Sequence, residues 1–322
     1  MQPNLPIKLV TKDYDYFSYL AYGDIRAEGL DLDYERDTER VLDRTLTDAS
    51  IQAGEIPFGR HLIKLANGDR SFVGIPVFPG RAFRHRCFFV RRGSGLHSFE
   101  QLKGARIGCN EWPATGHIWS RSILPLHGAR IEDIRWSVGT IDGAPLARSQ
   151  GELPAHAQAV TGKNLLSMLL DGELDALMCA HPPKVFYTQD SPVVRLLDDV
   201  RAAEKAYYRD TGIFPPIHII GVRREVYEKH PWVLRSLFNA LDGSRRKWQF
   251  ERKRMADSTP WLLAEIEETI AMFGEENWAP YGVEPNRKAV QALCDAQFAQ
   301  GLISKQLDAG AVFAEFEAQM AG

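Results

Sequence analysis

The densest group of side chains able to carry out chemistry lies between residues 72 and 121. Arg81, Arg84 and Arg86 can each bind a carboxylate through two parallel hydrogen bonds, because the guanidinium group is a planar fork of donors. His85 lies among them, and a histidine with the usual pKa of about 6.5 can donate and recover a proton at neutral pH. This combination indicates a small anionic ligand and a proton-transfer step.

Two further polar side chains follow strand-like apolar runs. Glu111 comes soon after residues 105–109, and His181 comes directly after residues 176–180. Open α/β sheets bind ligands at the carboxyl ends of their strands, so both positions favour a functional role. Glu111 could accept a hydrogen bond from a hydroxyl group, donate a proton if burial raises its pKa, or simply cap the following helix. We therefore predict His85, Glu111 and His181 as candidates for proton transfer.

The binding candidates come from both parts of the chain. Thr115 lies in the first turn of a predicted helix, where free backbone N–H groups suit a carboxylate. Trp112 could stack on an aromatic ring or belong to the core, and Arg26 and Ser50 each follow a predicted helix or strand near the N-terminus. The predicted substrate-binding residues are Arg26, Ser50, Arg81, Arg84, Trp112 and Thr115.

The arginines and histidines also have structural interpretations. The arginines could belong to a crossover strand that is salt-bridged to a sheet edge, with Arg84 and Arg86 on one face and His85 on the other. His85 could satisfy backbone carbonyl groups instead of a ligand. His218 lies inside the apolar run 217–222, which is typical of a histidine in the core.

No spacing in the sequence matches a familiar metal or nucleotide motif. His85, His117 and His181 could converge in space with Glu111, but neither HExxH nor a His-x-His pair occurs, so we predict no metal and no other cofactor. The glycines fit no phosphate-loop spacing, and no serine lies in a nucleophile elbow. Nucleotide binding and Ser-His-Asp catalysis are therefore not expected.

The composition is that of a soluble α/β protein with more than one core. The chain has 322 residues, about the size of two lobes, and its net charge of -3 provides no basic field for nucleic acid. The 4 cysteines form no CxxC pair and are expected as buried free thiols. The chain starts with Met, lacks an apolar signal segment and has no membrane-spanning run, so we expect a cytoplasmic protein with no membrane partner. Helices that could form subunit contacts leave a homo-oligomer open.

Alternating strands and helices predict a parallel sheet at the N-terminus. Residues 7–11 read as a buried strand, and residues 30–35 alternate apolar and acidic side chains with the period of a half-buried strand. Asp37 is a plausible N-cap for a helix that follows. Residues 72–78 read as a strand at a sheet edge or crossover, since Pro76 cannot donate a ladder hydrogen bond.

The order of the remaining elements predicts an inserted second lobe. From Arg81 the pattern runs through a strand carrying the arginines, a turn, strands at 105–109 and 176–178, and helices between them. The apolar run 217–222 then returns the chain to the first lobe. We predict a discontinuous first lobe of residues 1–80 and 213–322, with residues 81–212 inserted as the second lobe.

This layout resembles the type II periplasmic-binding-protein fold, an α/β fold of two lobes with a ligand cleft between them. Residues 98–108, SFEQLKGARIG, resemble the segment that opens the second lobe of that fold, and residues 230–241, HPWVLRSLFNAL, resemble the helix after its return strand. These segments specify the fold only.

Four segments carry a narrower resemblance. They are YLAYGDIRAEGLDL, FPGRAFRHRCFFVR, CNEWPATGHIWSR and PPIHIIGVRREVYEKHPW, spread over residues 19–232. Together they resemble the 4,5-dihydroxyphthalate decarboxylase family. The resemblance implies a cofactor-independent carboxy-lyase that converts 4,5-dihydroxyphthalate, or a similar aromatic mono- or dicarboxylate, to 3,4-dihydroxybenzoate (protocatechuate) and CO2.

Two other functions remain open at this point. Relatives that share much of the same pattern are solute receptors, which would bind a small aromatic anion and pass it to a transporter without catalysis. The absence of an export signal in the sequence argues against that role. A third candidate is an enzyme of the same fold with another aromatic or pyrimidine-like substrate.

Overall fold

A computed structural model describes residues 4–37, 40–143, 151–274 and 277–321. The chain forms two compact units. Unit 1 comprises residues 1–81, 216–291 and 307–322, and unit 2 comprises residues 82–215 and 292–306. The expected boundaries, 80/81 and 212/213, lie next to this division. Residues 292–306, which were expected with the first lobe, belong to unit 2.

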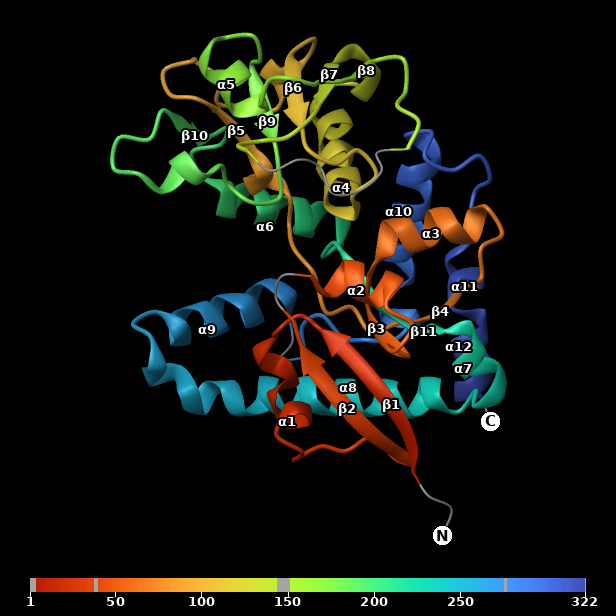
Figure 1. Cartoon of the computed structure of the whole chain (residues 1–322). Coiled ribbons are helices and arrows are strands. Elements are labelled where there is room, and N and C mark those ends of the chain that lie inside the picture. Colours follow the sequence, from red (N-terminus) through yellow and green to blue (C-terminus); the bar gives the residue numbers. More distant parts are fainter. Residues whose placement is uncertain (1–3, 38–39, 144–150, 275–276, 322) are drawn as a thin grey trace. The chain divides into compact units, whose positions relative to one another are not determined.

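Unit 1 contains a five-stranded mixed sheet in the order β2-β1-β3-β11-β4 (Figure 1). β1, β2 and β3 are parallel, and β11 is antiparallel to both β3 and β4. The predicted parallel opening and the return of the chain to this sheet are confirmed, as is the edge position of β4. The strands are β1 (Leu5–Thr11), β2 (Leu30–Arg36), β3 (Ala53–Pro57), β4 (Phe72–Ile75) and β11 (His218–Arg223).

The helices of unit 1 are formed by segments from both ends of the chain. The longest, α8, packs on η1, α1 and α12 (Figure 1). The 3-10 turns of this unit are η1 (Asp15–Phe17), η7 (Arg252–Ser258) and η8 (Glu284–Asn286). The α-helices are α1 (Ser18–Ala21), α2 (Val41–Thr47), α3 (Phe58–Ala66), α7 (Arg224–Lys229), α8 (Val233–Glu251), α9 (Leu262–Phe273), α11 (Ala309–Val312) and α12 (Ala314–Met320).

Unit 2 contains a six-stranded sheet in the order β10-β5-β9-β6-β7-β8. β9, β6, β7 and β8 are parallel, whereas β5 is antiparallel to β9 and to β10. The strands are β5 (Phe88–Arg91), β6 (Arg106–Cys109), β7 (Arg135–Val138), β8 (Ala157–Ala159), β9 (Ala176–Met178) and β10 (Val193–Arg195). The helices are α4 (Thr115–Ile123), α5 (Leu165–Leu170) and α6 (Val200–Thr211), and α10 (Arg287–Ala299) is divided between the two units. The 3-10 turns are η2 (His85–Cys87), η3 (Glu100–Leu102), η4 (Leu124–His127), η5 (Ile131–Asp133) and η6 (Lys184–Tyr187).

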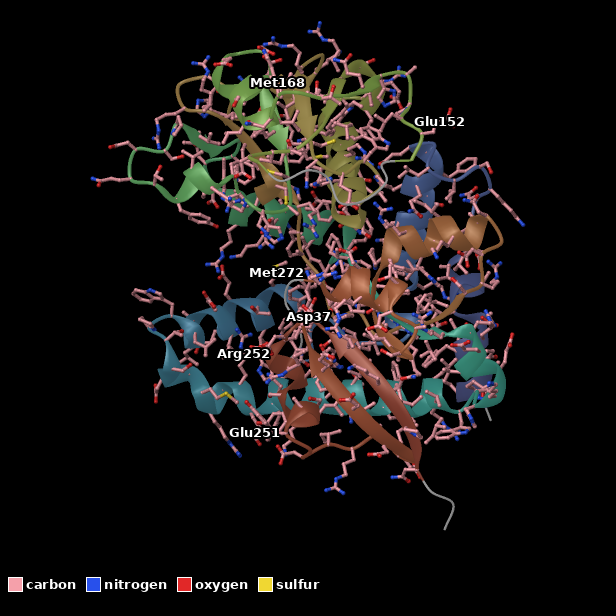
Figure 2. The ribbon with its side chains drawn as sticks, viewed as in Figure 1. Asp37, Glu152, Met168, Glu251, Arg252 and Met272 are labelled. Carbon is pink, nitrogen blue, oxygen red and sulfur yellow. The ribbon has the colours of Figure 1, made fainter. Side chains whose placement is uncertain are left out.

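Two local predictions are wrong. α2 begins at Val41 with Arg40 as its N-cap, while Asp37, labelled in Figure 2, accepts a hydrogen bond from Arg40 N at 2.9 Å and pairs with Arg44. The segment around Arg84 and Arg86 was predicted as a strand, but it forms the 3-10 turn η2, and the strand β5 begins only after it. In such a turn successive side chains are about a third of a rotation apart. Arg84 and His85 are consequently both buried while Arg86 is exposed.

In each sheet, the segments that carry candidate site residues leave the strands at one edge. In unit 2, Phe88 at the start of β5 and Cys109 at the end of β6 both pair with Met178 at the end of β9. The segments η2, the β6–α4 loop and the β9–η6 loop therefore leave the sheet at the same edge. In unit 1, β1, β3 and β4 end at the edge where β11 begins, because His218 pairs with Pro57.

Candidate functional site

Arg84 is a buried cation whose side-chain hydrogen bond within the described residues is to a cysteine sulfur and not to a carboxylate. Its side chain lies at the sheet edge of unit 2 and is 8% exposed. Nη1 lies 3.9 Å from the sulfur of Cys87, and Nε has no hydrogen-bond partner within the described residues. Burial lowers the pKa of Arg84 from its ordinary value, an effect that the Cys87 sulfur only partly opposes. A guanidinium group held in this way is suited to accept an anion from outside the protein.

The first turn of α4 lies directly against this guanidinium group. A Cβ atom added to Gly116 would lie 2.8 Å from Cζ of Arg84, so only glycine allows this approach. The first α-helical hydrogen bond runs from Ile118 N to Ala114 O, and Ala114 offers no side-chain cap. Gly116 N therefore precedes the first α-helical hydrogen bond and has no acceptor among the described residues. A helix N-terminus carries partial positive charge, so two positive groups meet here, and a bound carboxylate would neutralise both. We call Arg84 and residues 115–117 the α4 anion site.

Two buried histidines accompany the α4 anion site and are neutral at pH 7. Burial lowers the pKa of His117 to about 3 and that of His85 to about 4. His117 Nδ1 lies 2.7 Å from the carbonyl oxygen of Glu111 and so carries its proton there, which leaves Nε2 unprotonated and without a partner among the described residues. His85 packs edge-on against Tyr207 and Phe99, and its Nδ1 is also buried without a hydrogen bond in the described part of the chain.

A second buried arginine of unit 2, Arg121 in α4, has a structural role. Arg121 is fully buried, stacks 3.9 Å above the Trp112 ring, and donates to Gln300 Oε1 and to Trp112 O, both at 2.8 Å. Trp112 itself belongs to the core of unit 2, where it meets Trp136 edge-on. Of the two alternatives for Trp112, the structure therefore supports the core tryptophan.

The other predicted residues of unit 2 share the sheet edge with Arg84 and His85. Thr115 is buried at the first position of α4. Glu111 is half-buried in the β6–α4 loop, and its carbonyl group holds the turn into the helix by accepting from Ala114 N and His117 Nδ1. His181 is exposed in the loop after β9. The topology thus brings the three segments that carry these residues to one edge, while their contact with a ligand stays a prediction.

The three predicted residues of unit 1 do not all lie at one edge of its sheet. Arg26 is exposed in the loop that precedes β2, and Ser50 is exposed before β3, where its backbone and hydroxyl groups bond to Asp48. Both positions are at the amino ends of strands. Arg81 is half-buried at the sheet edge and donates to Asn286 and to the carbonyl oxygen of Pro280.

Unit 1 contains a cluster around Glu55 that the sequence predictions missed. Glu55 lies in the fully buried central strand β3 and is 0% exposed. Its Oε2 accepts from Lys12 N at 2.8 Å, and its Oε1 accepts from the Tyr14 hydroxyl at 2.7 Å and from His218 Nδ1 at 2.5 Å. Burial alone would raise the pKa of Glu55, but the charge of His218 and these hydrogen bonds hold it below the ordinary value. The carboxylate therefore stays ionised.

A signal for this cluster was present in the sequence. Glu55 is an acidic residue in the middle of the apolar run AGEIP, and a charge in a buried strand requires a partner. His218 occupies a similar position at the start of β11, opposite Pro57 in the sheet register. The partner itself could not be identified, because 163 residues separate His218 from Glu55.

The described ranges exclude two further classes of feature. No three or more His, Cys, Asp or Glu side chains within them are grouped so as to hold a metal ion. No described helix combines the length and apolar character needed to cross a membrane.

The fold is shared with solved structures of solute receptors. An alkanesulfonate-binding protein from Xanthomonas axonopodis matches with a TM-score of 0.53 and 15% identity, covering 97% of this chain and 99% of that chain. A periplasmic aliphatic sulphonate-binding protein from Escherichia coli matches with a TM-score of 0.55 and 14% identity, covering 96% of this chain and 91% of that chain. The protein thus has the two-lobed α/β fold of the periplasmic binding proteins, as the sequence predicted.

Sequence relatives define the family more closely, although no protein-family model matches the chain. A 4,5-dihydroxyphthalate decarboxylase from Comamonas testosteroni is 28% identical over 321 residues, covering 96% of both chains. A protein of the same name from Pseudomonas putida is 31% identical over 212 residues, covering 64% of this chain and 82% of the relative. The chain belongs to the 4,5-dihydroxyphthalate decarboxylase family, whose members are carboxy-lyases.

Proposed function

We propose that this protein decarboxylates 4,5-dihydroxyphthalate to 3,4-dihydroxybenzoate and CO2. The observation that carries the proposal is the family relationship along 96% of the chain. The buried guanidinium group of Arg84 beside the α4 N-terminus supports it, because the substrate carries two carboxylates and this group makes no direct ion pair with a carboxylate among the described residues. One of these carboxylates must be held while the other departs.

The reaction consumes one proton and needs no change in oxidation state. A proton adds to the ring carbon that bears the departing carboxylate, and a C–H bond forms. The hydroxyl group para to that carbon supplies electron density to the ring. The bond between the ring and the carboxylate then breaks, its electron pair returns to the ring, and CO2 leaves. The protein must bind the dianion, orient the ring and supply the proton.

The α4 anion site would hold the retained carboxylate. Arg84 would contribute charge-assisted hydrogen bonds, and Gly116 N would donate a further one from the helix end. The buried position of Arg84 strengthens this interaction, since charges attract more strongly where water is excluded.

The proposed roles of the three proton-transfer candidates differ. Because its pKa is about 4, His85 is neutral at pH 7 and would serve as a hydrogen-bond partner rather than as a store of an extra proton. Glu111 would accept a hydrogen bond from a ring hydroxyl, and His181 would contact the substrate from the loop after β9. None of these roles requires a cofactor.

The test is turnover by the purified protein. It is mixed with 4,5-dihydroxyphthalate, with and without a chelator, while CO2 release and the ultraviolet spectrum are followed. We expect one CO2 and one 3,4-dihydroxybenzoate for each substrate consumed. Saturable binding of the substrate without CO2 release would instead assign the protein to the solute receptors, and the chelator arm reports any need for a metal ion.

A further inference from the structure

Four aromatic rings gather beside the turn η2, next to the α4 anion site. The Phe83 ring lies 4.8 Å from the ring of Phe214, and it meets Tyr207 and Tyr208 edge-on at 6.3 and 6.4 Å. We call these four residues the Phe83 cluster. They belong to unit 2, as do Arg84 and α4, so the whole arrangement lies within one unit.

The backbone brings the rings of this cluster together. α6 ends at Gly212, whose φ of 66° is left-handed backbone that favours glycine and turns the chain sharply. The chain then runs beside the segment that precedes η2, where Ala82 N donates to Pro215 O at 3.1 Å. This hydrogen bond sets Phe214 next to Phe83.

The rings of the Phe83 cluster are half-buried. The apolar core of unit 2 is built on other aromatic residues, among them Phe88, Phe99 and Trp136, which are buried. A half-buried ring can still offer part of its surface to a ligand. Because three rings hold Phe83, it would lose little side-chain freedom when a ligand packs on it.

The Phe83 cluster and the α4 anion site lie on two sides of one short segment. η2 packs against both α4 and α6, with Arg84 directed to the first turn of α4 and the Phe83 ring to the end of α6. Phe83 and Arg84 are consecutive residues, so their Cα atoms are about 3.8 Å apart. A ring that carries a carboxylate bound at Arg84 is therefore within reach of the Phe83 side chain.

One nitrogen of Arg84 is open to such a carboxylate. Nε is buried, and Nη1 lies beside the Cys87 sulfur. Nη2 makes no hydrogen bond within the described residues and is not among their buried polar atoms that lack a partner, so it reaches the surface.

We infer that Phe83 is the platform on which the aromatic ring of the ligand packs, and that it makes the α4 anion site selective for aromatic carboxylates. This inference rests on the proposed function for the identity of the substrate and names the residue that recognises its ring. Two aromatic rings attract each other in offset-stacked or edge-on arrangements, beyond the effect of the buried area. Phe214, Tyr207 and Tyr208 are positioning residues, which hold the Phe83 ring without touching the ligand.

The experiment compares two unreactive dicarboxylates, phthalate and cis-1,2-cyclohexanedicarboxylate. Both have neighbouring carboxylates on a six-membered ring, but only the ring of phthalate is aromatic. The ratio of their dissociation constants, measured by calorimetry, is the aromatic preference of the protein. We expect the wild type to bind phthalate more tightly.

Phe83→Leu should reduce the aromatic preference by about threefold to tenfold, the usual contribution of an aromatic pair. The dissociation constant of the saturated ligand should stay within about twofold, because leucine keeps most of the apolar contact. With 4,5-dihydroxyphthalate, KM should rise while kcat changes little, since a platform binds the ground state and the transition state alike. Arg84→Met should instead weaken both ligands to a similar extent, because both carry carboxylates.

Phe186→Leu is the matched control. Phe186 is another half-buried phenylalanine of unit 2, and it meets Phe89 and Tyr187 edge-on at 5.4 and 5.1 Å. It packs on the core cluster that includes α5. The two leucine variants should melt a similar few degrees below the wild type, whereas Phe186→Leu should keep the aromatic preference.

Phe83→Trp keeps the inference testable if Phe83→Leu fails to fold. It retains an aromatic platform and adds a fluorophore to the 7 tryptophans of the chain. We expect its emission, after subtraction of the wild-type signal, to change on addition of phthalate with the dissociation constant that calorimetry gives. An emission that phthalate leaves unchanged while it binds would overturn the inference.

The outcomes separate the inference from the function on which it rests. If a folded Phe83→Leu keeps the aromatic preference within about twofold and melts like Phe186→Leu, the ring only fastens the segment before η2 to α6, and the platform is overturned while the decarboxylase stands. A wild type with no aromatic preference has the same consequence. If Phe83→Leu loses the preference but the wild type releases no CO2 from 4,5-dihydroxyphthalate, the platform stands and the proposed function falls.

Discussion

Replacing Arg84 with methionine should change stability and ligand binding in opposite directions. The side chain is buried, and within the described residues its side-chain hydrogen bond is to the Cys87 sulfur at 3.9 Å, so the ligand-free protein bears most of the desolvation cost of the charge. Methionine fills a similar volume without a charge. Replacing a buried ion pair with apolar side chains of similar volume is often neutral or stabilising by about 1 to 4 kcal/mol, and removing a single buried charge saves desolvation in the same way. The melting temperature should therefore stay level or rise.

Ligand binding should weaken in the same variant. The guanidinium group can offer two charge-assisted hydrogen bonds to a carboxylate, and each such bond contributes about 1.5 to 3 kcal/mol. A loss of about 3 kcal/mol corresponds to roughly a hundredfold increase in the dissociation constant. Calorimetric titration with phthalate measures the dissociation constant directly. Thermal melting in the absence of ligand measures the change in stability.

Arg121→Met is the matched control, because it removes the other buried arginine of the same unit. That change leaves Gln300 Oε1 and the Trp112 carbonyl group without their donor, both in a buried setting. Leaving buried acceptors unpaired costs about 1 to 3 kcal/mol for each group, so the melting temperature should fall by several degrees. Phthalate binding by the folded protein should stay within about threefold of the wild type.

A particular combination of results would refute this reasoning. If Arg84→Met melts as far below the wild type as Arg121→Met does, while binding phthalate normally, Arg84 is a structural residue. The α4 anion site would then have no role in ligand recognition.

Three further results are expected. Gly116→Ala should keep or slightly raise stability, because alanine favours helix over glycine by about 1 kcal/mol. It should lower kcat/KM, because the added Cβ displaces the Arg84 guanidinium group, and unchanged steady-state kinetics would contradict this. Burial lowers the pKa of His61 to about 4, so between about pH 6.5 and 4 the unfolded chain binds more protons and stability falls as pH falls. His61→Gln should flatten this dependence by up to one proton in urea titrations at several pH values. A thiol reagent should modify the native protein slowly and the unfolded chain quickly, since every cysteine is buried and free: Cys87, Cys109, Cys179 and Cys294.

The regular elements of the fold could be predicted because their patterns are local. The alternation over residues 30–35 and the apolar run 217–222 both gave strands at the expected places. The 3-10 turn at His85–Cys87 was missed, since charged residues before an apolar strand read as part of that strand. The turn changes which side chains are buried, and with them the composition of the site.

Residues of the candidate site could be predicted only where the order of strands along the sequence determines which sheet edge they lie at. Arg84, Glu111, Thr115 and His181 follow or precede strands of one sheet, so topology alone brings their segments to one edge. The Glu55 cluster depends on a contact across 163 residues and on β11 lying between β3 and β4. Patterns within a short window contain no information about such contacts.

The position of β11 also bears on how the chain folds as it is synthesised. β3 and β4 come from the first 75 residues, yet they are joined in the sheet only through a strand at residues 218–223. Unit 2 also needs a segment from late in the chain, since the buried Arg121 side chain donates a hydrogen bond to Gln300. Both units must therefore emerge from the ribosome unfinished. Until β11 and Gln300 have been made, strand edges in unit 1 and part of the hydrogen-bonding capacity of Arg121 stay open, and such edges favour non-native pairing in the nascent chain.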